Sequence, residues 1–190
     1  MIILASKSPR RQELLRLLGV PFEIITEDID ETMDPALAPE DEVRRVSALK
    51  ADAVNALVNP QDIVISADTI VVLGTQVMGK PKSAEDAKTM LRALSGRTHR
   101  VMTGLTVRSC DRSESVTVTT YITFRELSDR EIAAYVATGE PMDKAGAYGI
   151  QGGASVFVSH LDGDYFNVMG LPVCTLTQLL RSFGIPVLED

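Results

Sequence analysis

The amino-acid sequence predicts an α/β fold, because segments with helical periodicity alternate along the chain with runs of β-branched residues. The clearest strand covers residues 63–73, an almost unbroken apolar run of the kind found in central strands. The clearest helix covers residues 84–94, where Ser83 is a suitable cap and the apolar residues share one face. No repeat or linker interrupts the alternation, so residues 1–190 are predicted to form a single domain.

The composition restricts the classes of function. Of the 190 residues, 45% are hydrophobic and 24% are charged, which is ordinary for a globular protein. The formal net charge of -7 argues against nucleic acid as a partner, but it is compatible with one small nucleotide. Cys110 and Cys174 form no metal-binding pattern, so zinc is not expected. Basic residues interrupt the N-terminus early and no apolar segment approaches the roughly 20 residues of a membrane span, so we expect a cytoplasmic protein with no membrane partner.

The N-terminal segment combines a strand at residues 2–4 with a helix at residues 9–18. Ser8 suits the N-cap of that helix, and a proline follows it at the first helical position. Arg10 and Arg11 fall in the first turn, where the helix dipole disfavours cations. An anion bound at the helix start would explain them, and the exposed amides and guanidinium groups would then form a phosphate site. Two solvated surface arginines are the alternative.

A second strand at residues 22–26 leads into an acidic loop at residues 27–39 and a long helix at residues 39–57. The carboxylates of the loop are either solvated, or one or two of them hold a hard cation near the arginine pair. Lys50 lies on the apolar stripe of the long helix. Its side chain either extends along that surface into solvent or reaches a phosphate.

Asp68 interrupts the apolar strand at residues 63–73. A carboxylate buried in such a run costs several kcal/mol unless it is paired, hydrogen-bonded or bound to a metal. The strand therefore indicates that Asp68 is a functional residue. The alternative is a structural aspartate that accepts hydrogen bonds from nearby backbone amides.

Residues 74–80 match the beginning of a P-loop, but Pro81 stands where the motif requires Ser or Thr. A P-loop must also open directly into a helix, whereas the helix signals here begin only at Ser83. We therefore predict a hairpin turn at residues 74–75 and keep Lys80 as a separate cation candidate.

The next segments are predicted to be strands at residues 100–108 and 115–124, joined by a turn at residues 111–113. Ser128 and Glu131 have the spacing of a capping box, which predicts a further helix after them.

A glycine-rich loop covers residues 141–153, and its glycines would let the backbone approach a ligand closely. Tyr148 and Gln151 are candidates for contacting a base by stacking and by amide hydrogen bonds, although a plain flexible loop would show the same glycines. The chain is then predicted to form strands at residues 155–161 and 165–168 and a last helix at residues 172–183.

Taken together, these segments resemble the Maf family of nucleoside-triphosphate pyrophosphatases. The shared motifs extend over nearly the whole chain: Ser6-Lys7-Ser8-Pro9-Arg10-Arg11, Glu31, Lys50, Ala67-Asp68-Thr69, Lys80-Pro81, Leu94-Ser95-Gly96-Arg97-Thr98-His99, Lys144-Ala145-Gly146-Ala147-Tyr148-Gly149-Ile150-Gln151-Gly152 and Gly170-Leu171-Pro172.

The glycine-rich run resembles the subfamily that acts on dTTP and UTP, rather than the one that acts on methylated guanosine nucleotides. One departure is visible, because members often have Gln-Gly-x-Gly where this chain has Gln151-Gly152-Gly153-Ala154. This departure concerns the backbone path behind the base pocket and not the reaction.

The resemblance implies two α/β lobes without a separable linker, arranged around a mixed, strongly bent sheet with a central nucleotide cleft, as in inosine triphosphatases. It implies house-cleaning hydrolysis of dTTP and UTP to the monophosphate and pyrophosphate, and modified pyrimidine nucleotides stay open as substrates. A divalent cation, Mg²⁺ or Mn²⁺, is the implied cofactor. A homodimer is the implied assembly.

The resemblance also assigns roles to individual residues. Asp68 is the implied general base and a metal-associated carboxylate, and Glu31 is the second metal carboxylate. The implied phosphate-binding residues are Arg11, Lys50 and Lys80, with hydrogen bonds added by Ser6 and Ser8, and those that set base preference are Arg10, Thr69 and Gln151.

A second hypothesis from another class is a non-catalytic nucleotide-binding regulator of cell division, an inhibitor of septum formation. Asp68 favours the enzyme, because binding an anion gains nothing from a carboxylate at that position.

Overall fold

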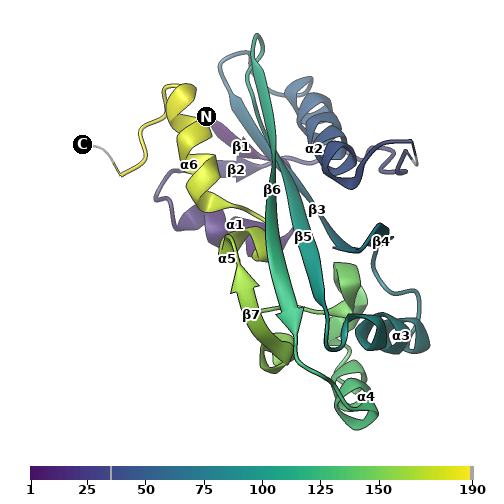
Figure 1. Cartoon of the computed structure of the whole chain (residues 1–190). Coiled ribbons are helices and arrows are strands. Elements are labelled where there is room, and N and C mark those ends of the chain that lie inside the picture. Colours follow the sequence, from purple (N-terminus) through teal and green to yellow (C-terminus); the bar gives the residue numbers. More distant parts are fainter. Residues whose placement is uncertain (35, 189–190) are drawn as a thin grey trace. The chain divides into compact units, whose positions relative to one another are not determined.

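A seven-stranded sheet of mixed direction confirms the predicted α/β class in this computed structural model, which describes residues 1–34 and 36–188 (Figure 1). The strand order is β2-β1-β3-β5-β6-β7, and β4 pairs with β3. Strand β1 runs parallel to both of its neighbours, β2 and β3. The strands are β1 (Ile2–Leu4), β2 (Phe22–Ile24), β3 (Ile63–Leu73), β4 (Gln76–Met78), β5 (Thr98–Arg108), β6 (Ser113–Phe124) and β7 (Val158–Asp162).

Of the six α-helices in the part of the chain that the structure describes, all except α5 lie where the sequence predicts a helix. They are α1 (Pro9–Arg16), α2 (Pro39–Asn55), α3 (Ala84–Leu94), α4 (Asp129–Ala137), α5 (Tyr165–Met169) and α6 (Val173–Ser182). The predicted bounds of β3 and α3 are confirmed, and the capping box that precedes α4 is formed by Ser128 and Glu131. Across the described ranges, no helix is both long enough and apolar enough to cross a bilayer.

Three short 3₁₀ helices lie in the glycine-rich loop or overlap its ends, at Glu140–Asp143, Ala145–Ala147 and Gly153–Phe157. The last of them includes residues 155–157, so the strand predicted at residues 155–161 begins only at Val158. The acidic loop predicted at residues 27–39 lies between β2 and α2 as expected, and its Pro35 is outside the described residues.

The strand predicted at residues 165–168 is wrong, because these residues belong to helix α5. Asp164 accepts a hydrogen bond from the amide of Phe166 at 2.8 Å, which starts the helix. Asn167 is fully buried and its amide donates to the carbonyl of Val101 at 3.1 Å and to Thr120 Oγ1 at 3.0 Å. The apolar and aromatic residues of this segment resemble a strand locally, but the cap and the inward-facing asparagine favour a helical turn.

The chain divides into two compact units, and β3, β5 and β6 each contribute residues to both. Unit 1 contains residues 1–68, 103–118 and the described residues from Gly170 onward. Unit 2 contains residues 69–102 and 119–169. The prediction that residues 1–190 form a single domain stays a prediction.

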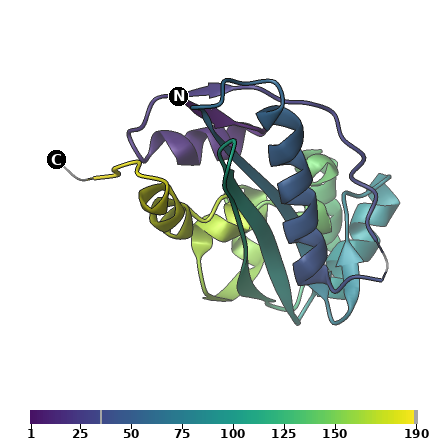
Figure 2. The same ribbon diagram turned by 90° about the horizontal axis from the view of Figure 1, so that it is seen from above.

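In unit 1, helix α2 packs on strands β1 and β3 (Figure 2). Ala51 and Val54 of the helix form one apolar cluster with Ile3 and Val64 of the strands. Gly104 of β5 permits a close approach of the helix backbone, since a Cβ added there would overlap the carbonyl group of Val43. This packing fixes α2, and with it Lys50, against the sheet.

In unit 2, helices α3 and α4 pack against each other and cover a core rich in aromatic residues. Phe124 lies edge-on to His99 and to Tyr148, with ring centroids 5.0 and 4.8 Å apart. Tyr135 of α4 contacts Phe157 in the same manner at 5.2 Å. Because Tyr148 belongs both to this core and to the glycine-rich loop, the loop packs directly on the core of unit 2.

Candidate functional site

The ammonium group of Lys50 lies between two carboxylates in unit 1. Lys50 Nζ is 2.8 Å from Asp68 Oδ1 and 3.1 Å from Glu31 Oε2. The side chains of Lys50 and Asp68 are only 16% and 17% exposed, whereas that of Glu31 is 57% exposed. Of the two alternatives for Lys50, extension into solvent is therefore excluded, because the side chain turns inward to an anionic centre. Asp68 in turn has the charged partner that its place in an apolar strand requires.

Two serines hold the elements that carry Lys50 and Asp68. Ser66 lies two residues before Asp68 on β3, and therefore on the same face of the strand. Its hydroxyl donates to the backbone carbonyl of Ser47 on α2 at 2.5 Å, and both serines are fully buried. The hydroxyl of Ser47 is also 2.8 Å from that of Thr106 on β5. These hydrogen bonds fix the register of α2 on the sheet at the level of the ion pair.

The predicted phosphate-binding segment lies at the start of α1. Ser8 is at the N-cap as predicted, although within the described residues its side chain makes no capping hydrogen bond. Ser6 Oγ accepts hydrogen bonds from the amide of Ser8 at 3.2 Å and from Arg11 Nη1 at 3.3 Å. Arg11 Nε donates to the carbonyl of Gly170 at 2.8 Å. These hydrogen bonds hold the Arg11 side chain at the start of the helix, so it does not extend into solvent as a surface arginine would.

The charges of unit 1 interact at this position. Burial lowers the pKa of Arg11, while the negative charge of Asp68 raises it. Arg10 lowers the pKa of Arg11 further, and Glu31 raises it. A guanidinium group stays charged despite such shifts. Arg11 therefore supplies a partly desolvated positive charge in the field of the same two carboxylates that contact Lys50.

The other predicted site residues lie in unit 2. Thr69 follows Asp68 on β3, so its side chain points to the opposite face of the strand. Lys80 is exposed just after β4, and Gln151 is exposed in the glycine-rich loop. The structure therefore brings Ser6, Arg11, Glu31, Lys50 and Asp68 together in unit 1 and places Thr69, Lys80 and Gln151 in unit 2.

The prediction that Tyr148 stacks on a base is wrong. Its side chain is buried in the core of unit 2, with the whole residue 6% exposed, and its hydroxyl lies 2.8 Å from His99 Nε2. Burial raises the pKa of Tyr148, so the phenol keeps its proton. His99 and Phe124 pack edge-on against the ring, and the buried ring is not available for a base to stack on.

Asp68 and Glu31 offer the oxygen ligands that Mg²⁺ and Mn²⁺ prefer. Both carboxylates lie within 3.1 Å of one cationic atom, Lys50 Nζ, which shows that they share a position favourable to positive charge. Among residues 1–34 and 36–188, no group of three or more His, Cys, Asp and Glu side chains is arranged as a metal site. A carboxylate pair suits a hard divalent cation that takes further oxygens from a phosphate ligand.

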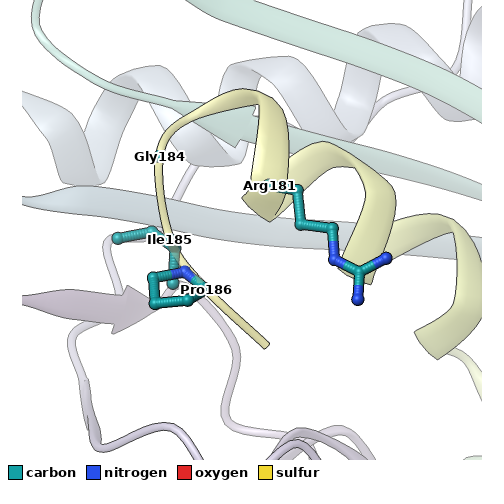
Figure 3. A pocket seen from close by; sticks show the side chains of 4 residues that line it. All are labelled: Arg181, Gly184, Ile185 and Pro186. Atoms are coloured by element: carbon teal, nitrogen blue, oxygen red, sulfur yellow. The ribbon is translucent and has the colours of Figure 1, made fainter. Parts of the chain in front are cut away.

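Two surface hollows in unit 1 contain none of the predicted site residues. The larger one, of about 320 Å³, lies at the end of helix α6 and is lined by Arg181, Gly184, Ile185 and Pro186 (Figure 3). The second, of about 200 Å³, includes Met1 and Asp62 beside strand β1.

Ser66 and Ser47 are site residues that the sequence prediction missed. A small hydroxyl residue two positions before Asp68 in an otherwise apolar strand was the available signal for Ser66. For Ser47 the signal was its place on the buried stripe of the helix, one turn before Lys50.

The chain is similar to known proteins over nearly its whole length. Residues 1–183 match the family model described as "Maf-like protein". Proteins named dTTP/UTP pyrophosphatase from Bacillus cereus (strain AH820) and Bacillus anthracis are each 50% identical to this chain over 186 residues, which is 98% of this chain and 97% of theirs.

Two solved structures share the fold. The Ham1 protein of Staphylococcus aureus aligns with a TM-score of 0.53 and 16% identity, covering 96% of this chain and 98% of that one. A HAM1 protein from Coxiella burnetii aligns with a TM-score of 0.51 and 14% identity, covering 95% of this chain and 98% of that one. With the family match over nearly all of its length and relatives at half identity, the chain belongs to the Maf family.

Proposed function

We propose that this protein is a nucleoside triphosphate pyrophosphatase that hydrolyses dTTP and UTP to the monophosphate and pyrophosphate, and thereby clears these nucleotides from the cellular pool. The observation that carries the proposal is the ion pair of Lys50 and Asp68 beside Glu31 and Arg11 in unit 1. Relatives that are 50% identical over 98% of the chain and are named dTTP/UTP pyrophosphatase support the same reaction.

Hydrolysis between the α and β phosphates requires a water aimed at the α-phosphorus, a group that accepts its proton, and cations that stabilise the leaving pyrophosphate. We assign proton acceptance to Asp68, because β3 and the hydrogen bond from Lys50 hold its carboxylate in one position. Lys50 and Arg11 are assigned to phosphate oxygens. Both are partly desolvated, which strengthens their attraction to a polyanion.

Asp68 and Glu31 would hold the divalent cation, Mg²⁺ or Mn²⁺. When bound, this cation neutralises charge on the triphosphate and polarises its phosphoryl oxygens. Oxygen ligands and the proximity of both carboxylates to one ammonium group support this assignment.

The remaining assignments follow the family motifs residue by residue. Ser6 and Ser8 are proposed to donate to phosphate oxygens at the start of α1, where backbone amides and the helix dipole favour an anion. Lys80 is proposed as a further phosphate cation. Arg10, Thr69 and Gln151 are proposed to set the preference for the base.

The test is a panel of the common nucleoside triphosphates incubated with the protein and Mg²⁺ or Mn²⁺, in which pyrophosphate and orthophosphate are measured separately. We expect pyrophosphate and monophosphate in equal amounts, with dTTP and UTP consumed fastest. Binding of nucleotides without turnover of any of them would instead favour a non-catalytic regulator.

A further inference from the structure

Both carboxylate oxygens of Glu140 are engaged beneath the glycine-rich loop of unit 2. Oε1 accepts a hydrogen bond from the hydroxyl of Tyr135 at 2.9 Å, and Oε2 accepts one from the backbone amide of Gly153 at 3.0 Å. The Tyr135 hydroxyl itself accepts a hydrogen bond from the amide of Gly149 at 3.1 Å. One carboxylate and one phenol therefore hold the loop at two points, Gly149 and Gly153.

The loop backbone lies directly on this carboxylate. A Cβ added to Gly152 would overlap Glu140 Oε1 and lie 2.5 Å from its carboxyl carbon. A Cβ at Gly153 would lie 3.2 Å from the ring of Tyr135. Gly152 thus has a physical role, because it lets the backbone pass close over the carboxylate of Glu140, and Gly153 lets it lie close to the ring of Tyr135.

Lys144 also contacts both Glu140 and the loop. Its ammonium group donates to the backbone carbonyl of Glu140 at 2.7 Å and pairs with Asp143 at 2.7 Å. The side chain of Lys144 lies against Gly149, where an added Cβ would be 2.7 Å from Lys144 Cε. Burial raises the pKa of Tyr135, so its hydroxyl keeps the proton that it donates to Glu140.

Gln151 is the exposed residue between the two anchored points. A side-chain amide can discriminate between bases only if its oxygen and nitrogen stand at fixed positions, and those positions depend on the backbone beneath it. We propose that Glu140, acting together with Tyr135, is a positioning residue for base selection, because it fixes the backbone on both sides of Gln151. This inference rests on the proposed function.

The substitution Glu140→Gln tests the proposal. The neutral amide keeps the size of the side chain but has one acceptor atom where the carboxylate has two. If its oxygen accepts from Gly153, its NH₂ group faces the Tyr135 hydroxyl, which must then change from donor to acceptor. We expect kcat/KM for dTTP and UTP to fall about tenfold and kcat/KM for the poorly used purine triphosphates to change less than about twofold. The ratio between the two classes should therefore shrink. Inhibition by pyrophosphate, which has no base, should be unchanged.

Glu131→Gln is the matched control. Glu131 is also a carboxylate of unit 2 with two kinds of donor, since it accepts from the amide of Ser128 at 2.9 Å and pairs with Arg125 at 2.6 Å. It caps α4 and has no contact with residues 149–153 among the described interactions. We expect this variant to lower Tm and leave the ratio between pyrimidine and purine substrates unchanged.

Tyr135→Phe provides a second route if Glu140→Gln does not fold. It removes the hydroxyl that links Gly149 to Glu140 and keeps the ring against Phe157. It should shrink the same ratio.

The outcomes separate the two claims. If the wild-type protein turns over dTTP and UTP but the ratio of kcat/KM between pyrimidine and purine triphosphates is unchanged in the Glu140 and Tyr135 variants, the inference alone is overturned. The inference is also overturned if this ratio falls as much in the Glu131→Gln control. Absence of turnover by the wild-type protein with any triphosphate would overturn the proposed function and this inference with it.

Discussion

Lys50 and Asp68 come from different elements, α2 and β3, and form an ion pair of 2.8 Å between Nζ and Oδ1. Both side chains are less than a fifth exposed, so the pair has lost much of its hydration. Holding such a pair costs desolvation energy, and paired charges of this kind are frequent at functional sites. Because Lys50 also contacts Glu31, its ammonium group would compete with the divalent cation proposed for the two carboxylates.

Replacing Lys50 tests whether its ammonium group competes with a divalent cation for Asp68 and Glu31. Without the ammonium group, Asp68 and Glu31 lose the cation that contacts both of them and keep only the field of Arg11. The substitution Lys50→Gln should therefore tighten binding of Mn²⁺ to the nucleotide-free protein about tenfold, or about 1.4 kcal/mol. Electron paramagnetic resonance of free Mn²⁺ measures this affinity without turnover. Lys88→Gln is the control, because Lys88 pairs with Glu85 on an exposed helix face. Equal Mn²⁺ affinity in all three proteins would contradict the role of Lys50 in this centre.

The substitution Ser66→Ala should weaken the attachment of α2 to β3 next to the Lys50–Asp68 ion pair. It removes the hydrogen bond to the carbonyl of Ser47 and should lower the free energy of unfolding by about 1–2 kcal/mol. Because the register of α2 on β3 then relaxes, we expect kcat to fall more than KM rises. Ser95→Ala is matched to it, since Ser95 accepts a backbone hydrogen bond from Leu127 in unit 2. That control should lose similar stability with kcat unchanged, and the same loss of kcat in both variants would refute a specific role of Ser66.

The sequence alone predicts those parts of the fold whose signals are local. The apolar run of β3, the serine cap of α3 and the capping box of α4 each depend on residues within a few positions of one another, and each is confirmed. Helix α5 was predicted as a strand because its aromatic and apolar residues resemble one locally. The Asp164 cap was an available local signal for a helix, whereas the hydrogen bonds of Asn167 to strands distant in the chain were not.

The same distinction applies to the candidate site. Asp68 and Lys50 were recognisable because a charge in an apolar pattern needs a partner. Ser66 looks like an ordinary strand residue until its hydrogen bond to α2 is known, and Tyr148 looks accessible until His99 and Phe124 are packed around it. Glu140 lies in a segment without helical or strand periodicity, so the spacing of residues does not predict its hydrogen bond with the amide of Gly153.

Gln151 should control which base is used. The substitution Gln151→Leu keeps a side chain of similar size without the amide, so kcat/KM for dTTP and UTP should fall by about tenfold or more. Affinity for pyrophosphate, measured as its inhibition constant, should stay the same. Equal losses for every nucleoside triphosphate would refute the assignment of Gln151 to the base.

His99 should make the stability of unit 2 depend on pH. Burial lowers its pKa to about 4, whereas the unfolded chain has a histidine pKa of about 6.5. Below about pH 6.5 the unfolded state binds more protons than the folded state, so the free energy of unfolding should fall as pH decreases from about 6.5 to 4, by on the order of 3 kcal/mol in total. The pKa of Glu131 is held down to about 2 by its hydrogen bonds with Arg125 and Ser128, so its contribution is lost only at lower pH, below about 4.5.

Urea unfolding at several values between pH 4.5 and 7 measures this dependence. In the variant His99→Gln the slope should be flatter, because the group that protonates on unfolding is gone. The exposed His160 provides the control, and His160→Gln should keep the wild-type slope. A slope that survives in His99→Gln would show that another group is responsible.

The most direct test of the account is hydrolysis of dTTP in ¹⁸O-labelled water by the wild-type protein and by the variant Asp68→Asn, with the label located by mass spectrometry. Attack of water on the α-phosphorus places the label in dTMP and leaves pyrophosphate unlabelled. We predict this pattern for the wild type and a rate reduced by about 100-fold or more in Asp68→Asn, with its circular dichroism and Tm close to those of the wild type. Label in pyrophosphate, or a rate for Asp68→Asn near that of the wild type, would contradict the account.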